Sequence, residues 1–191
     1  MPRVVSGKAR GLILKAPKGD NVRPTSDKSK EAIFSSIADY IPESSFLDLF
    51  AGTGQIGIEA LSRGAESAVF VDSSAESIKF IRQNLASTRL GESARVLKKP
   101  AQAAIKSLKA KGEKFDLIYF DPPYAKFEEL FLELSEELLP AILAENGLLI
   151  CEEDSIEYAK RGEALIPDNF VCLRHCKYGQ AMVSFYVIRK A

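Results

Sequence analysis

The chain lacks tryptophan, has one histidine, and has three cysteines with no Cys-x-x-Cys pair among them. No apolar run approaches the ~20 residues that span a bilayer, and the first residues lack the apolar core of a signal peptide. These absences favour a cytoplasmic protein with no membrane partner. The odd cysteine count argues against a disulfide framework, so we expect three small, buried hydrophobic residues in a reducing compartment.

A zinc site is the alternative reading of the cysteines. Cys172, His175 and Cys176 lie close together in the sequence and could in principle bind zinc. All three fall on one short strand-like run, which gives poor tetrahedral geometry. We therefore expect no metal ion.

Charge of one sign is scarce in one stretch and missing from another, although the whole chain has a net charge of zero. Residues 1–30 hold eight basic residues and two acids, which gives a net charge of +6. Residues 127–157 hold ten acids and no lysine or arginine, which gives −10. This asymmetry suits a protein that binds a polyanion on its basic side. For the acidic stretch we expect an ordinary solvated surface.

The N-terminal stretch differs in pattern from the remainder. Residues 1–24 alternate short β-like pieces with glycine, lysine and proline, which predicts a small basic β-hairpin extension outside the core. A helix is expected from about residue 27 to residue 39, between Pro24 and Pro42. We therefore divide the chain into a basic extension at 1–24 and a main domain at 25–191.

From residue 45 onward, strand-like and helix-like segments alternate. Strands are expected at 45–50, 67–72, 94–98, 115–120 and 147–152. A loop at 51–57 is followed by a helix that ends at residue 63, and further helices are expected at 75–88, 101–111, 128–143 and around 156–161. The last two strand-like runs, 169–177 and 181–189, are too close together for a crossover helix and must form an antiparallel hairpin. The pattern predicts an α/β fold with a seven-stranded, mostly parallel sheet in three layers. The closing hairpin is typical of Rossmann-like methyltransferases and fits the dehydrogenase plan poorly.

A glycine-rich turn follows the first of these strands. Gly52, Gly54 and Gly57 fit the pattern G-x-G-x-x-G, in which glycine lets the backbone approach a ligand closely. Asp72 ends the next strand, at the distance where an acid binds ribose hydroxyls. On its own this pattern suits NAD, FAD or S-adenosylmethionine.

Asp48 distinguishes between these cofactors. It lies inside the first strand, where a carboxylate is expensive to bury unpaired. It would repel the pyrophosphate of a dinucleotide, which disfavours an NAD-linked dehydrogenase. It suits the ammonium and sulfonium groups of S-adenosylmethionine.

The apolar run at 115–120 stops abruptly at Asp121, Pro122, Pro123 and Tyr124. The two prolines stiffen the chain at a strand's carboxyl end, which is where ligands bind in open α/β sheets. The Asp121 carboxylate and the Pro122 carbonyl can accept both N–H bonds of an exocyclic base amine, and Tyr124 can stack on the ring. A duplex hides that amine, so the target base must be unpaired or flipped.

Taken together, these motifs resemble the amino-group methyltransferases that carry a (D/N)-P-P-(Y/F) motif. Over nearly the whole chain, the sequence closely resembles the bacterial RsmD family. Those enzymes methylate the N2 amine of a guanine in small-subunit (16S) ribosomal RNA and have the class I S-adenosylmethionine-dependent methyltransferase fold. The resemblance rests on residues 4–11, 23–27, 30–34, 47–54, 57–65 and 121–124.

The resemblance implies three groups of site residues. The catalytic group is Asp121, Pro122, Pro123 and Tyr124. The cofactor group is Asp48, Phe50, Ala51, Gly52, Thr53, Gly54, Asp72, Ser73 and Gln102, with Arg23, Pro24 and Thr25 near both cofactor and target base. The RNA-binding group is Arg3, Lys8, Arg10, Lys15, Lys18 and Arg23.

One position departs from related methyltransferases, which often carry an acid or asparagine after the third strand, near the adenine of the cofactor. Here residues 98–100 read Lys-Lys-Pro. Backbone groups or Gln102 must then hold the adenine.

Other functions stay open. A DNA adenine-N6 methyltransferase would use a similar motif, but the chain has no evident sequence-reading domain. Protein glutamine methyltransferases usually have asparagine in place of Asp121. A non-catalytic RNA-binding or assembly module would be favoured by loss of Asp121, which is present. The expected partner is 16S ribosomal RNA or the assembling 30S subunit, with a monomer as the default state.

Overall fold

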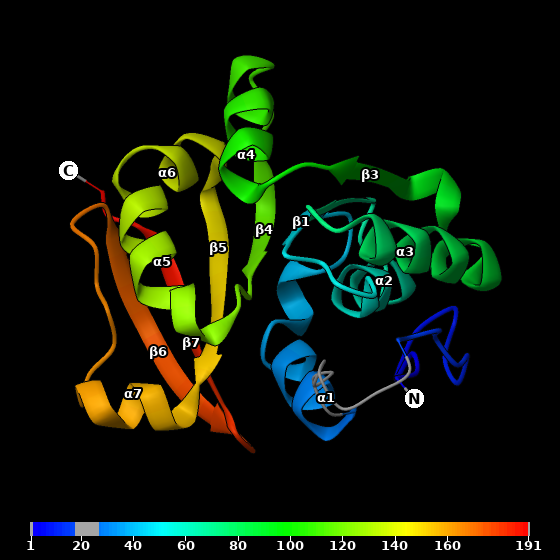
Figure 1. Cartoon of the computed structure of the whole chain (residues 1–191), viewed down its shortest axis with the longest axis horizontal. Helices are drawn as coiled ribbons and strands as arrows, with labels where there is room; N and C mark the ends of the chain where they lie inside the picture. The colour runs from blue at the N-terminus through cyan, green and yellow to red at the C-terminus, as the bar shows by residue number, and fades with distance from the viewer. Residues whose placement is uncertain (1, 18–26, 191) are drawn as a thin grey trace.

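The computed structural model describes residues 2–17 and 27–190, which form a seven-stranded sheet in the order β3-β2-β1-β4-β5-β7-β6 (Figure 1). The first five strands pair in parallel, and β7 pairs antiparallel with both β5 and β6. This confirms the mostly parallel sheet with a closing antiparallel hairpin. The strands are β1 (Ser45–Leu49), β2 (Ser67–Asp72), β3 (Ala94–Lys98), β4 (Phe115–Phe120), β5 (Leu143–Asp154), β6 (Phe170–Tyr178) and β7 (Ala181–Ile188).

Helices cover both faces of the sheet and give the expected three layers (Figure 1). One face carries α1 (Asp27–Ser36), α2 (Gln55–Ser62) and α3 (Ala75–Thr88), and the other carries α4 (Ala101–Ala110), α5 (Phe127–Glu136) and α6 (Leu138–Ile142). A further helix, α7 (Ser155–Arg161), follows β5. Short 3-10 turns are η1 (Ala38–Tyr40), η2 (Gly91–Ser93) and η3 (Tyr124–Lys126). None of the helices in the described ranges has the length and apolar character needed to cross a membrane.

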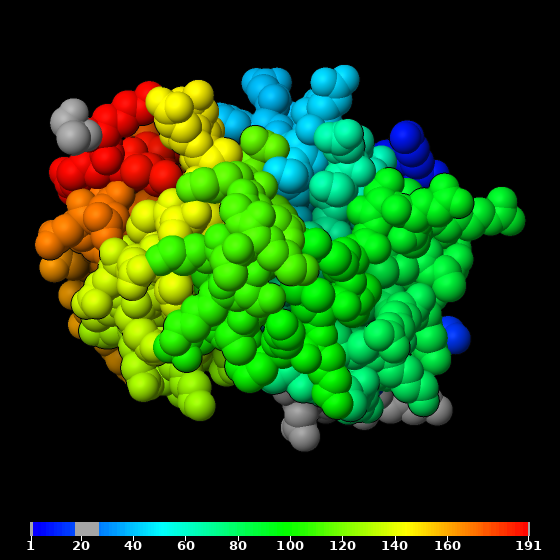
Figure 2. Space-filling model, turned by 90° about the horizontal axis from the view of Figure 1, so that it is seen from above, coloured from blue at the N-terminus to red at the C-terminus, as the bar shows by residue number. Residues whose placement is uncertain are grey.

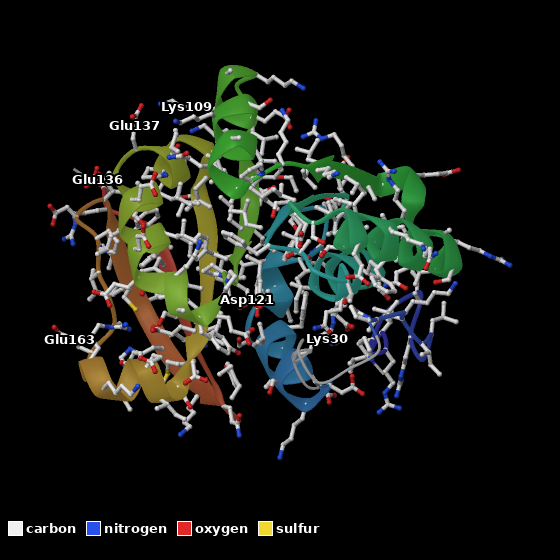
Figure 3. The ribbon with its side chains drawn as sticks, in the orientation of Figure 1. Lys30, Lys109, Asp121, Glu136, Glu137 and Glu163 are labelled. Carbon is white, nitrogen blue, oxygen red and sulfur yellow. The ribbon has the colours of Figure 1, made fainter. Side chains whose placement is uncertain are left out.

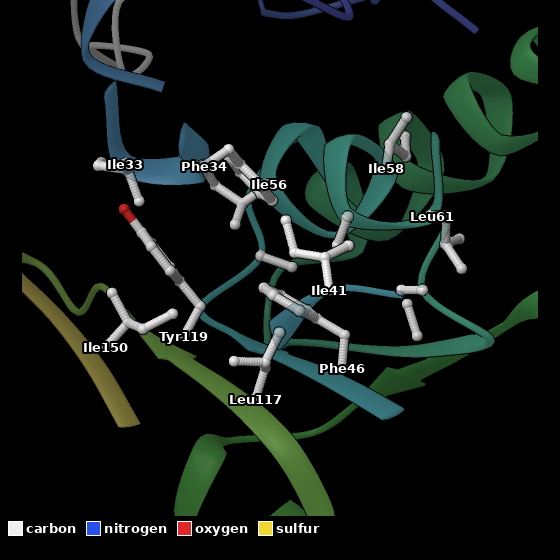
Figure 4. Close-up of a cluster of buried hydrophobic side chains, with 14 of the residues drawn as sticks. Ile33, Phe34, Ile41, Phe46, Ile56, Ile58, Leu61, Leu117, Tyr119 and Ile150 are labelled. Carbon is white, nitrogen blue, oxygen red and sulfur yellow. The ribbon is translucent and has the colours of Figure 1, made fainter. Parts of the chain in front are cut away.

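Two apolar cores lie on opposite sides of the sheet because successive strand residues point to opposite faces. Phe46 and Tyr119 pack into the core under α1, α2 and α3 (Figure 4). Their neighbours Leu47 and Phe120 pack into the core under α4, α5 and α6. The two cores are therefore built from alternate residues of the same strands.

The prediction of one long helix at 128–143 is wrong, because the structure has two helices there, α5 and α6. The break falls at Glu137, which has φ −139° and ψ −38°. Pro140 explains it. In a continuous helix its missing N–H would leave the Glu136 carbonyl unbonded, and its ring would clash with that carbonyl.

The N-terminal segment is not the peripheral extension that we expected. Arg3 and Ile13 form an antiparallel bridge, as a hairpin requires. However, Val4 and Leu14 are 1% and 0% exposed and belong to the core under α1, α2 and α3. Isolated apolar residues in a basic, glycine-containing stretch give no periodic pattern, so the sequence did not reveal this packing.

Candidate active site

Three acids stand at the carboxyl ends of β1, β4 and β5, on the face covered by α1, α2 and α3. They are Asp48, Asp121 and Glu152. Each lies two residues after a strand residue whose side chain belongs to the core on that face. Asp48 and Glu152 are 2% and 3% exposed, whereas Asp121 is half-buried. Figure 3 shows Asp121 at the end of β4, on the side of α1.

Burial and nearby negative charge raise the pKa of two of these carboxyl groups, Asp48 and Asp121. Burial raises the pKa of Asp48 to about 7, and the charge of Asp72 adds to this effect. Burial also raises the pKa of Asp121 well above its usual range, and the nearby charges of Glu152 and Asp48 raise it further. Buried like charges are costly. A positively charged ligand would relieve this cost, so the site favours a cation.

Glu152 is the member of this group that sequence reasoning missed. The Tyr119 hydroxyl donates a hydrogen bond to its carboxylate, and Figure 4 shows that hydroxyl directed towards Ile33 of α1. Burial raises the pKa of Tyr119 well above its usual range, so the tyrosine remains a donor. Asp48 and Asp72 were recognised in the sequence because each is an acid at or near the end of an apolar strand. Glu152 fits the same pattern.

Two aspartates hold the glycine-rich loop between β1 and α2. The Gly52 N–H donates to Asp72 Oδ2 at 2.9 Å, and the Gly57 N–H donates to Asp48 Oδ2 at 2.9 Å. Gly52 and Gly54 have φ of +54° and +78°, which glycine adopts without strain. A Cβ built on Gly52 would meet no atom within 4 Å, so this loop surface is open to a ligand.

Gly57 serves helix packing rather than ligand approach. A Cβ at this position would lie 2.4 Å from the Phe70 ring of β2. The third glycine of such fingerprints allows close contact between helix and strand. The contact brings the start of α2, and with it the loop, down onto the sheet.

Phe50 stands at the start of the loop with φ +65°, a left-handed conformation that is strained for a residue other than glycine. Its ring packs edge to face on Phe120, with 5.4 Å between centroids, and contacts the core of the opposite face. The ring anchors the loop, so a cofactor contact by Phe50 would come from its backbone.

Gln55, the first residue of α2, supplies a buried acceptor. Its side chain is 8% exposed, and its Oε1 has no hydrogen-bond partner. A buried unpaired acceptor costs roughly 1–3 kcal/mol, and a ligand N–H would remove that cost. Together with the buried carboxylates, this acceptor fits a ligand that carries an ammonium and a second positive charge.

The segment after β4 is shaped as the prolines predict. Pro122 is buried and Pro123 is exposed. The Lys126 N–H donates to the Pro123 carbonyl at 2.8 Å, which closes the turn of η3. Tyr124 is 41% exposed, so part of its ring is accessible to a stacking partner.

Three further predicted cofactor residues lie around the loop. The Ala51 N–H donates to the Val71 carbonyl, and the Thr53 carbonyl accepts from the Asn84 amide. Ser73 is exposed directly after β2. These placements put Ala51, Thr53 and Ser73 beside Gly52 and Asp72, and their contact with a cofactor stays a prediction.

Gln102 has another partner in the structure. It is exposed on α4, and its amide donates to Glu133 of α5. A role in holding adenine would require Gln102 to leave Glu133.

Four of the predicted residues, Lys18, Arg23, Pro24 and Thr25, lie outside the described ranges. The remaining predicted RNA-binding residues, Arg3, Lys8, Arg10 and Lys15, are all exposed. Arg3 forms an exposed ion pair with Asp27 at 2.7 Å.

The acidic stretch is only partly the solvated surface that we expected. Glu152 and Glu153 are buried, with 3% and 2% of their surface exposed. Arg161 of α7 pairs with both carboxylate oxygens of Glu153 at 2.8 Å. The partner lies outside the acidic stretch, so counting charges within that stretch could not reveal it.

The cysteines show no metal-binding arrangement. Cys151 is buried, whereas Cys172 and Cys176 are half-buried, and all three are free thiols. Within residues 2–17 and 27–190, no group of three or more His, Cys, Asp or Glu side chains could hold a metal ion.

Known proteins resemble this chain along nearly its full length. A "Putative rRNA methyltransferase YlbH" from Bacillus subtilis is 37% identical over 188 residues, covering 96% of this chain and 97% of the relative. The "Ribosomal RNA small subunit methyltransferase D" of Escherichia coli K12 is 30% identical over 186 residues, covering 96% of this chain and 88% of the relative.

A solved structure shares the architecture. The "Putative methyltransferase yhhF from Escherichia coli" is 30% identical, with a TM-score of 0.80, and the match covers 98% of this chain and 97% of that one. The fold is accordingly that of the class I methyltransferases. A family described as "Conserved hypothetical protein 95" matches residues 2–187. The chain therefore belongs to this family, the RsmD family.

Proposed function

We propose that this protein transfers a methyl group from S-adenosylmethionine to the exocyclic N2 amine of a guanine in 16S ribosomal RNA. The observation that carries the proposal is the carboxylate of Asp121, which stands with Asp48 and Glu152 at the strand ends beside an accessible Tyr124. The names of the relatives support ribosomal RNA as the substrate class.

S-adenosylmethionine supplies a methyl group on a sulfonium, so the leaving group needs no metal. The chain's own residues provide a complementary site for it. The loop at Gly52 is open, the carboxylates of Asp48 and Asp72 shape that loop, and Gln55 Oε1 is a vacant acceptor. These features match the positive charges and the N–H donors of the cofactor.

Asp121 and Pro122 orient the target amine. The nitrogen lone pair of an exocyclic amine is delocalised into the base, which makes it a poor nucleophile. Two acceptors on its two N–H bonds draw the nitrogen towards tetrahedral geometry and direct the lone pair at the methyl. Catalysis is then mainly orientation and electrostatic stabilisation. Stacking on Tyr124 contributes roughly 1–3 kcal/mol.

The raised pKa of Asp121 links cofactor binding to amine binding. A proton on Asp121 would occupy an oxygen that must accept the amine N–H. A bound cation lowers the pKa of the neighbouring carboxyl groups. The site therefore becomes a better acceptor for the amine once the cofactor is bound.

A DNA adenine-N6 methyltransferase is the second candidate, because the same Asp121 and Pro122 acceptors fit the adenine amine equally well. A non-catalytic RNA-binding module is the third. We place the protein in the cytoplasm as a monomer that acts on ribosomal RNA or on the assembling 30S subunit.

Methyl transfer from radiolabelled S-adenosylmethionine separates these candidates. The acceptors are naked 16S ribosomal RNA, unmethylated small subunits and duplex DNA, each digested to nucleosides after reaction. We expect label in N2-methylguanosine from RNA or subunits. Label in N6-methyladenine from DNA would support the second candidate, and cofactor binding without transfer to any acceptor would support the third.

A further inference from the structure

A second basic surface lies outside the N-terminal stretch. Residues 79–99 hold six basic residues and one acid, which gives a net charge of +5. Arg95 pairs with Glu113. The other five are exposed and form no salt bridge with any residue in the described ranges: Lys79, Arg82, Arg89, Lys98 and Lys99.

Three of these residues share one face of α3 and its C-terminus. Lys79 and Arg82 are three positions apart, a spacing that places side chains on the same side of a helix, and Arg89 is the C-cap residue that follows α3. The buried residues of α3 include Ile78, Ile81 and Leu85. The three charges extend over about 15 Å at the rise of an α-helix. We call them the α3 basic face.

The N-terminal segment packs against α3. The Lys15 N–H donates to Asn84 Oδ1 at 2.7 Å, and the Asn84 amide donates back to the Lys15 carbonyl at 3.0 Å. Asn84 belongs to α3 and is fully buried, so the contact is firm. Figures 1 and 2 both show the N-terminal residues, in blue, beside the green residues of α3.

The N-terminal segment is also held against α2, so its basic side chains have a defined position. The N–H groups of Val5 and Ser6 donate to the buried Glu59 carboxylate at 2.8 and 2.9 Å. Gly7 lies so close to α2 that a Cβ would fall 1.8 Å from the Ser62 carbonyl oxygen. Lys8 and Arg10 project from this anchored segment into solvent.

At its other end the surface reaches the candidate active site. Lys98 is the last residue of β3, and the Lys99 N–H donates to the Asp72 carbonyl at 3.1 Å. β3 is parallel to β2, so both lysines lie at the carboxyl ends of the strands, the end of the sheet at which Asp121 follows β4. The positive surface thus runs from the N-terminal segment along α3 to the rim of the site.

Two lysines on other sides of the molecule are paired with acids. Lys109 of α4 pairs with Glu137, and Lys160 of α7 pairs with Glu157. Figure 3 shows Lys109 and Glu137 on the side of α4 and α6, away from Lys30 of α1. A polyanion is therefore attracted to the α3 side of the molecule and repelled from the acidic side.

We propose that the α3 basic face, with Lys98 and Lys99, binds the phosphodiester backbone of the substrate RNA beside the target nucleotide. The choice of RNA rests on the proposed function. The surface would thereby align the strand between the N-terminal segment and Asp121.

The test is equilibrium binding of full-length unmethylated 16S ribosomal RNA to the full chain over a salt series. The variant Lys79→Gln/Arg82→Gln removes two charges from the surface, and Lys109→Gln/Lys160→Gln removes two neutralised charges elsewhere. Each phosphate contact contributes roughly 0.7–0.9 to the slope of log affinity against log salt. We expect the surface variant to lose about 1.4–1.8 of that slope, which corresponds to roughly 25- to 60-fold in affinity at 0.1 M salt against a 1 M reference, and the control to match the wild type.

Arg89 provides a variant that removes a charge without disturbing the fold. It closes α3 with φ +58°, where glycine is the preferred residue. Arg89→Gly should therefore fold at least as well as the wild type and still bind the RNA roughly 3- to 10-fold more weakly. Unchanged affinity in this variant and in Lys79→Gln/Arg82→Gln would overturn the proposal.

Other outcomes separate this proposal from the proposed function. Cofactor affinity should stay unchanged in the surface variants, and methyl transfer should show a raised KM for RNA with kcat retained. Transfer to a position other than guanine N2, with RNA binding still dependent on α3, would overturn the guanine assignment and leave this inference standing. Tighter binding of duplex DNA than of the RNA would overturn RNA as the ligand of this surface.

Discussion

The two faces of the sheet are built from the same strands, yet the strands present different kinds of residue to the two faces at their carboxyl ends. On the face under α4, α5 and α6, the strands end in apolar residues: Leu49, Phe120 and Cys151. On the face under α1, α2 and α3, the adjacent positions are carboxylic acids: Asp48, Asp121 and Glu152. A step of one residue along a strand changes the face. One face therefore carries packing residues at the point where the other carries ionisable groups.

The sharpest test of this difference compares Asp121→Ala with Phe120→Leu. We expect Asp121→Ala to reduce methyl transfer by at least about 10²–10³-fold, as loss of a preorganised polar contact does elsewhere. Its affinity for S-adenosylmethionine should change little. Phe120→Leu should lower the free energy of unfolding by about 2 kcal/mol with kcat retained. Normal turnover by Asp121→Ala, measured with labelled cofactor, would refute its assigned role.

Packing on the catalytic face can be perturbed without touching a charge. Gly57→Ala places a methyl group against the Phe70 ring and should destabilise the protein by roughly 1–3 kcal/mol. Gly91→Ala is the matched control, because a Cβ there meets no atom within 4 Å. Urea unfolding of both variants measures the difference. Equal stability would mean that α2 is not seated on Phe70 as described.

The smallest expected effect is a pH dependence of the affinity for S-adenosylmethionine, which arises on the face under α1, α2 and α3. A cationic ligand binds the carboxylate form of Asp48, whose pKa burial raises to about 7. Below pH 7 Asp48 must release a proton on binding, so affinity for S-adenosylmethionine should fall by up to about tenfold per pH unit between pH 7 and pH 6. Above pH 7 the contribution of Asp48 should level off.

Asp48→Asn should flatten this dependence. Cys151→Ala on the opposite face should preserve it, because burial raises the pKa of that thiol well above its usual range. Calorimetric titration of the cofactor between pH 5.5 and pH 8 measures both variants. An identical pH dependence in Asp48→Asn and wild type would show that Asp48 does not titrate in this range.

Local patterns predicted most of the fold. The bounds of β2, β3, β4 and α3 agree with the sequence expectation, because β2 and β4 are short apolar runs and α3 has apolar residues at helical spacing, each between turn residues. The sheet, its closing hairpin, and the positions of Asp48, Asp72 and Asp121 at strand ends follow from the same patterns. Pro140 was visible in the sequence, and it would have predicted the break between α5 and α6.

The features that local patterns did not predict depend on partners far along the chain. Lys30 and Glu59 are both fully buried and lie 3.7 Å apart, although charged residues are usually exposed. The Lys30 ammonium also donates to the Arg3 carbonyl, and burial lowers its pKa. Neither charge carries a local mark of burial. The proposed role of the α3 basic face likewise depends on a distant part of the chain, because Lys15 of the N-terminal segment packs against α3.

The contacts of the N-terminal segment have a consequence for synthesis of the chain. Its hydrogen-bond partners on α2 and α3 lie 53 to 69 residues further along. The segment therefore cannot form these contacts until α2 and α3 have been synthesised. A tag fused before Arg3 must leave the Arg3 carbonyl within reach of Lys30. A tag that holds the segment away would deprive the buried Lys30 of this carbonyl and the buried Glu59 of the N–H groups of Val5 and Ser6.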